Sequence, residues 1–82
     1  MAETIKIIST EIALSTANTV SSASVVRIHN NSGGSVLITR ANGSGTLGTC
    51  TLANGDTEYF LKLPTDTLAS NVAVRAVSVA FS

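Results

Sequence analysis

Short β-branched runs separated by tight turns constrain the fold of this chain. Apolar residues recur with period two, or in runs rich in Val, Ile and Thr, and nowhere keep helical spacing for more than one turn. In the last third, two apolar runs flank Pro64-Thr65-Asp66 and contain no Gly or Pro. The pattern predicts an all-β protein whose strands are Thr4–Ser9, Glu11–Leu14, Ala23–Asn30, Ser35–Arg40, Thr46–Leu52, Thr57–Leu63 and Val72–Phe81.

Turn residues between these runs predict how the strands connect. Asn30–Gly34, Ala41–Gly45 and Asn54-Gly55 can supply the positive φ of hairpin loops, which predicts a four-stranded antiparallel meander from Ala23 to Leu63. Pro64 ends the meander because proline has no N–H to donate. The first strand is then the natural antiparallel partner of the last, with both in a second sheet.

The expected architecture is a small two-layer antiparallel sandwich or flattened barrel of about seven strands. One domain covers residues 1–82, since a second core needs roughly 50 residues of its own. The small polar residues of Ser15–Ser24 suit either a flexible linker or an ordered edge or loop, and we favour the ordered alternative.

Alternation within the strands predicts which side chains are buried. Val26 and Ile28 should face the core, with Arg27 and His29 outside. In Thr57–Leu63 we expect a core face made of Thr57, Tyr59, Leu61 and Leu63, and an outer face made of Glu58, Phe60 and Lys62. The final strand is apolar in both phases, so it should be covered on both faces.

Composition suggests a subunit that has protein neighbours. Hydrophobic residues make up 44% of the chain and charged residues only 12%, a poor coat for a free monomer. The formal net charge is zero, which argues against nucleic-acid binding. No run approaches the roughly 20 apolar residues of a membrane span, and the N-terminal residues do not resemble a signal peptide. We therefore expect synthesis in the cytoplasm, with no nucleic-acid or membrane partner.

The chain offers little for catalysis. Cys50 and His29 are its only thiol and imidazole, and Cys50 lies mid-strand, where a small buried hydrophobe is the usual interpretation. The acidic residues show no motif spacing, and no cluster of His and Cys suggests a zinc site. We expect no enzymatic activity, no cofactor and no metal.

The sequence resembles small structural proteins of tailed bacteriophages, especially phages that infect marine bacteria and cyanobacteria. The resemblance covers nearly the whole chain and rests on these segments: Thr4-Ile5-Lys6, Ala17-Asn18-Thr19-Val20, Ser24-Val25-Val26-Arg27, Val36-Leu37-Ile38-Thr39-Arg40, Gly48-Thr49 with Thr51-Leu52-Ala53, Lys62 with Pro64-Thr65-Asp66-Thr67-Leu68, and Val77-Ser78-Val79-Ala80. It implies a β-rich virion component that is present in many copies and has no catalytic role.

Two functions follow as hypotheses. The first is a capsid decoration or cement protein that binds the major capsid protein on the outside of the shell as a homo-oligomer, a trimer or a dimer. The residues expected at its protein interfaces are Glu3, Ile5, Lys6, Ile8, Phe60, Arg75 and Phe81. The second is a tail, fibre or baseplate component that binds a receptor or glycan through Arg27, His29, Tyr59 or loop Asn residues.

Overall fold

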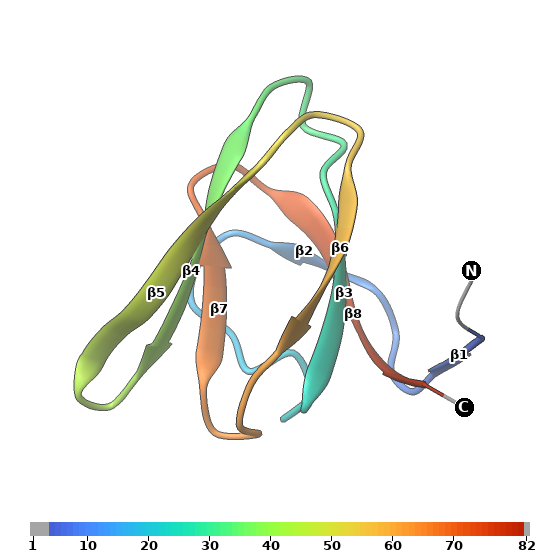
Figure 1. Ribbon diagram of the computed structural model, residues 1–82, viewed down its shortest axis with the longest axis vertical. Coiled ribbons are helices and arrows are strands. Elements are labelled where there is room, and N and C mark those ends of the chain that lie inside the picture. Colours follow the sequence, from blue (N-terminus) through green and yellow to red (C-terminus); the bar gives the residue numbers. More distant parts are fainter. Residues whose placement is uncertain (1–3, 82) are drawn as a thin grey trace.

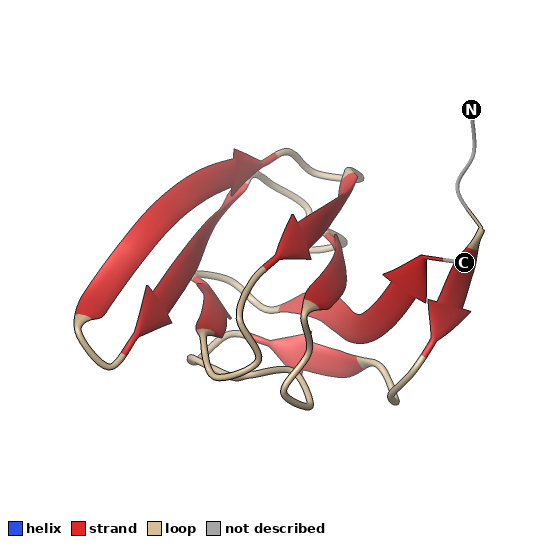
Figure 2. Cartoon of the chain, turned by 60° about the horizontal axis from the view of Figure 1, so that its bottom comes forward, coloured by secondary structure: helices blue, strands red, loops and turns tan. Residues whose placement is uncertain are grey.

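The computed structural model describes residues 4–81 and shows an all-β protein built from two antiparallel sheets, without a helix in that range. The sheets pack as an open sandwich and do not close into a barrel (Figures 1 and 2). The strands are β1 (Ile5–Ile7), β2 (Ile12–Leu14), β3 (Val25–His29), β4 (Val36–Asn42), β5 (Gly45–Leu52), β6 (Thr57–Leu61), β7 (Thr67–Ser70) and β8 (Val74–Phe81). The predicted fold class is confirmed.

The large sheet has the strand order β1-β8-β3-β6, with β2 also paired to β8, and the small sheet has the order β5-β4-β7. Both β1 and β2 pair with β8 in antiparallel register, so the predicted pairing of the first and last strands is confirmed. β7 lies between the last two predicted strands and was not itself predicted as a strand. It pairs with β4 at the edge of the small sheet.

The predicted meander from Ala23 to Leu63 is wrong. Only β4 and β5 form a hairpin, whereas β3 pairs with β6 and β8, so the chain changes sheets after β3 and again after β5. The chain bends at residues 32–34 and turns at Asn54-Gly55, but neither segment closes the predicted hairpin, because turn residues specify a reversal and not the partner of the strand that follows. Here the reversals carry the chain across the roughly 10 Å between packed sheets.

Buried Asn30 joins the two crossings. Its Nδ2 donates to the carbonyls of Gly34 at 2.8 Å and Leu52 at 2.9 Å, and its Oδ1 accepts hydrogen bonds from the backbone N–H and the hydroxyl of Ser32. Its backbone also bonds to the second crossing, because its N–H donates to Asp56 and its carbonyl accepts from Gly55. One side chain therefore ties the end of β3 to the end of β5.

The core lies between the sheets and consists of aliphatic side chains from both. Val26 and Ile28 face inward and are fully buried, as predicted. Opposite them on β8, Ser78 and Ala76 share the same face. The core cluster is Leu14, Val20, Ala23, Val26, Ile28, Val36, Ile38, Leu52, Leu68, Val74 and Ala76.

β8 is covered on both faces, which confirms that prediction: Val74 and Ala76 are buried on one face, and Val77 and Val79 on the other.

The faces predicted for Thr57–Leu63 are reversed. Phe60 lies opposite Val26 and packs against the core, whereas Tyr59 lies opposite Arg27 on the outer face. Lys62 is only 3% exposed, and Leu61 is 75% exposed. The prediction failed because both phases of this strand contain large apolar residues, and because the two charges assigned outward, Glu58 and Lys62, lie at the ends of the run.

Residues Ser15–Ser24 are ordered, as favoured above. Asn18 forms a β-bridge with Leu68, in which the two residues exchange backbone hydrogen bonds of 3.0 and 2.9 Å. Val20, Ser21 and Ser22 follow with φ values of 52°, 58° and 54°, a left-handed turn without glycine. The N–H of Val20 donates to Asn18 Oδ1 at 2.7 Å, and the buried Val20 side chain fixes the turn to the core.

Candidate functional site

Three surface regions could carry function: an apolar arm at one end, a polar cluster on the outer face of the large sheet, and a cleft between β5 and β6. The arm consists of β1, the next residue Ile8, and residues 79–81 of β8. There the register sets Ile5 opposite Phe81 and Ile7 opposite Val79, and these residues of β8 pair with no other strand. Figures 1 and 2 show the arm extending away from the rest of the two layers.

Large apolar side chains are exposed on the arm. Ile7 is 71% exposed and Ile8 is 58% exposed. The Ile8 N–H donates to the Ser78 carbonyl at 2.9 Å, and Ser9 Oγ accepts from the Ser78 N–H at 3.1 Å, so the backbone that follows β1 is fixed along β8. Adjacent exposed isoleucines, one at the end of a paired strand and one directly after it, are typical of a protein contact surface.

Four of the predicted interface residues lie in this arm: Ile5, Lys6, Ile8 and Phe81. Glu3 lies outside the described residues. Exposed Ile7 was not among the predicted interface residues, although the adjacent pair Ile7-Ile8 indicates that one isoleucine must face outward in an edge strand.

The other two predicted interface residues lie elsewhere. Arg75 is on the outer face of the large sheet and is bound to Glu11. Phe60 does not lie on the outer surface as predicted, because it packs against the core at the β5–β6 cleft.

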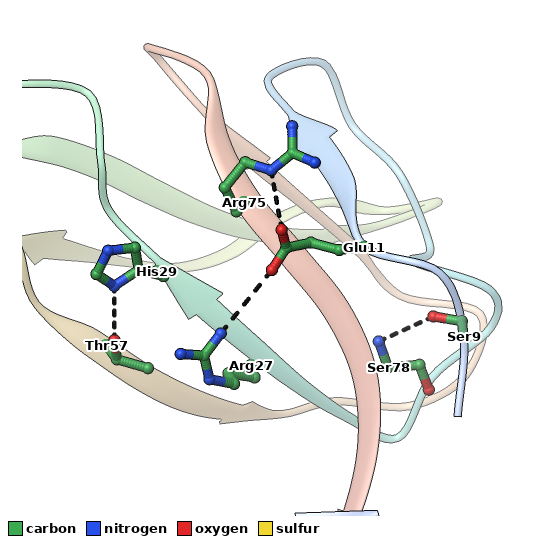
Figure 3. Close-up of polar contacts among 7 residues, drawn as sticks. All are labelled: Ser9, Glu11, Arg27, His29, Thr57, Arg75 and Ser78. Carbon is green, nitrogen blue, oxygen red and sulfur yellow. Dashed lines mark hydrogen bonds and ion pairs between the residues drawn. The ribbon is translucent and has the colours of Figure 1, made fainter. Parts of the chain in front are cut away.

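Glu11 organises the polar cluster on the outer face of the large sheet (Figure 3). Its carboxylate accepts a hydrogen bond from Arg75 Nε at 3.1 Å and lies 3.9 Å from Arg27 Nη1. His29 Nδ1 lies 2.7 Å from the Thr57 hydroxyl, and His29 is opposite Arg75 in the register. Tyr59, 42% exposed, is opposite Arg27. Two guanidinium groups, an imidazole and an aromatic ring therefore share one face with a single acid.

Cys50 and His29 do not form a catalytic pair. Cys50 belongs to β5 of the small sheet, and His29 belongs to β3 of the large sheet, where it is bonded to Thr57. The Cys50 thiol is exposed, so its predicted burial is wrong. The error arose because β5 is exposed along its length up to Leu52, which the apolar residues on either side of Cys50 did not indicate.

The cleft lies between β5 and β6, has a volume of about 230 Å³, and is lined by Ile38, Arg40, Gly48, Thr49, Cys50, Phe60, Leu61 and Leu68. Its floor is aliphatic and aromatic, and Arg40 is the only charged residue among those that line it. The volume is below the roughly 300–1,000 Å³ of most cofactor and drug-sized sites, so the cleft suits one or two side chains.

Lys62 is buried near a second buried charged residue, Asp66. Its Nζ donates to the carbonyls of Ala23 at 2.7 Å and Leu63 at 3.2 Å. Burial lowers the pKa of Lys62 below its ordinary 10.5, and the nearby Asp66 carboxylate opposes this shift. Asp66 Oδ2 accepts the Leu63 N–H at 3.2 Å, which completes the turn from β6 to β7. These contacts hold a turn, and Lys62 is too enclosed to reach a ligand.

No group of three or more potential ligands for a metal ion occurs among residues 4–81. The same range contains no helix long and apolar enough to span a membrane. Comparison with protein-family models, curated proteins and solved structures finds no match to this chain.

Proposed function

We propose that the protein is a non-enzymatic structural component of a tailed-phage virion, which binds the major capsid protein on the outside of the shell and stabilises it. The observation that supports this best is the arm, because two adjacent isoleucines, Ile7 at the end of β1 and Ile8 directly after it, are exposed where backbone hydrogen bonds fix the chain along β8. The low charge of the chain and its resemblance to phage structural proteins point the same way. A subunit that binds only the assembled shell stabilises that shell by mass action.

The test is co-sedimentation of the purified protein with empty capsid shells of the phage that encodes it. The double variant Ile7→Asp/Ile8→Asp should bind at least about tenfold more weakly, the usual effect of removing an interface hot spot. Leu63→Asp is the matched control, because Leu63 is similarly exposed at 66% but lies outside the arm. This function is excluded if the shells do not bind the wild-type protein, or if they bind the double variant as tightly as the wild type.

In this proposal the protein acts as a homo-oligomer, a trimer or a dimer. An 82-residue domain buries only about 60% of the surface that its unfolded chain exposes, and contacts between copies would add to that burial. Light scattering measures the mass in solution, and a monomer at all concentrations would remove this part of the proposal.

A second candidate is a tail, fibre or baseplate protein that binds a receptor or glycan. It is favoured by the placement of Tyr59 on the outer face, opposite Arg27 and on the same face as His29, because sugar sites combine an exposed ring with polar side chains. A glycan array screened with the wild-type protein and with Tyr59→Ala tests it. Hits lost in the variant would support this role, and an array without hits would oppose it.

A further inference from the structure

The β5–β6 cleft lies between two unpaired strand edges. β5 ends the small sheet and pairs only with β4, and β6 ends the large sheet and pairs only with β3. They leave a common turn and separate, as Figure 1 shows. A strand placed between them would find backbone donors and acceptors on both sides.

The β5 edge lacks the features that usually protect an edge strand. Its eight residues, Gly45–Leu52, contain no charge and no proline, and only Leu52 is buried. Natural proteins generally block such edges with lysine, proline or a covering loop. At the other edge of the small sheet, a preceding segment of the chain covers strand β7: Asn18 forms a β-bridge with Leu68, and the Ser15 carbonyl accepts the Ser70 N–H.

Arg40 adds a chemical preference to the cleft. It is half-buried among Ile38, Phe60 and Leu68, and within residues 4–81 its guanidinium makes no hydrogen bond or ion pair. A guanidinium offers five donors in a planar fork that matches a carboxylate. In an apolar cleft, such a pair is stronger than on an open surface.

We propose that the β5 edge and its cleft bind an extended segment of a partner protein, which adds a strand to β5 and pairs an Asp or Glu side chain with Arg40. An apolar side chain of the same segment packs against Phe60. The cleft volume of about 230 Å³ accommodates side chains of this kind. This site is separate from the arm and does not depend on the identity of the surface that the arm binds.

The missing acid argues against a β5–β5 pair between two copies of the chain at this edge. Residues Val36–Leu52, which form β4, β5 and their turn, contain Arg40 and no Asp or Glu. An antiparallel β5–β5 pair would leave both Arg40 side chains without a carboxylate and on the same sheet. A partner that carries its own acid satisfies both the strand edge and the guanidinium.

The experiment selects binders from a display library of random eight-residue peptides, the length of β5, on the wild-type protein. The selected peptides should share one Asp or Glu between apolar residues. Arg40→Gln should weaken their binding about ten- to a hundredfold, the effect of losing a charge-assisted hydrogen bond. Arg75→Gln, in the outer-face cluster, is the matched control and should leave binding unchanged.

Cys50 provides a second measurement that does not depend on the variants. It is the only thiol of the chain, it is exposed, and it lines the cleft. A selected peptide should slow its alkylation by iodoacetamide in proportion to occupancy. The proposal is overturned if the peptides lack an acid, bind Arg40→Gln unchanged, or leave Cys50 fully reactive. It is also overturned if the protein alone dimerises and thereby protects Cys50.

Discussion

The two lateral sides of the sandwich differ in whether the edge strand of the small sheet is covered. On the side of β7, which we call the closed side, residues 15–18 run along the strand edge and the Asn18–Leu68 bridge covers it. On the side of β5, the open side, no segment among residues 4–81 pairs with the free edge, and a cleft remains between the sheets. The same small sheet therefore has one edge that is part of the folded core and one edge that is available to another molecule.

The closed side should dominate stability. Leu68→Asp would bury a carboxylate in the core and should cost several kcal/mol, against a total of about 4–12 kcal/mol expected for a chain of this length. Leu47→Asp, on exposed β5, should change the unfolding free energy by less than about 0.5 kcal/mol.

Urea unfolding followed by circular dichroism compares the two variants. Equal losses of unfolding free energy would mean that β5 contributes as much to stability as β7. The proposed difference between the two sides would then be wrong.

Asn30 should be the most important polar residue of the open side. Asn30→Ala removes hydrogen bonds to Gly34, Leu52 and Ser32, among them the buried bond to the Leu52 carbonyl, so we expect a loss of about 1–3 kcal/mol. Asn42→Ala removes one exposed bond to the Ser44 N–H and should cost under about 1 kcal/mol. Hydrogen exchange should be faster for the β5 amides in Asn30→Ala and unchanged in Asn42→Ala. Unchanged β5 exchange in Asn30→Ala would show that the Asn30 side chain does not hold the end of β5 to the end of β3.

Local patterns in the sequence predicted the strands but could not predict the two sides. The runs and turns were located correctly because Gly, Asn and Pro limit the backbone at each reversal. The partner of β3 depends instead on buried contacts such as those of Asn30, which are separated in sequence. Thr67–Ser70 was missed because its four residues are too few to show alternation.

The candidate sites show the same limit. The predicted pairing of the first strand with the last places Ile5 and Lys6 on the arm, whereas an interface role for Ile5, Lys6 and Ile8 stays a prediction. Arg40 and Cys50 were missed because their exposure in a cleft exists only once β5 and β6 diverge onto different sheets. Phe60 was assigned to the wrong face for lack of a register with β3.

The closed side carries backbone strain that a single substitution should relieve. Ser21 has a φ of 58° in an exposed left-handed turn, a conformation that costs a non-glycine residue roughly 1–2 kcal/mol. Ser21→Gly should therefore stabilise the protein, by about 0.5–1 kcal/mol after the added freedom of the unfolded chain is subtracted.

Ser44→Gly is the matched control in the turn of the open side. Ser44 does not have a positive φ, so glycine there should destabilise the protein slightly. Thermal unfolding of both variants gives the sign of each change in stability. A loss of stability in Ser21→Gly would show that the backbone at Ser21 is not strained.

Lys62 lies on the turn that leads from β6 on the open side to β7 on the closed side, and its burial predicts a small pH effect. Because its pKa is lowered in the folded protein, between that pKa and 10.5 the unfolded chain binds more protons than the folded one. The unfolding free energy should therefore rise with pH across this window, and at lower pH the penalty for burying the charge is present in full. Lys62→Met should lose the rise, whereas Lys6→Met, at an exposed position, should keep it. Urea unfolding measures both pH profiles. If the profiles of the wild type and Lys62→Met are parallel, burial of Lys62 has no electrostatic cost and this prediction is wrong. The unfavourable local energy near the closed side would then be limited to the backbone strain of residues 20–22.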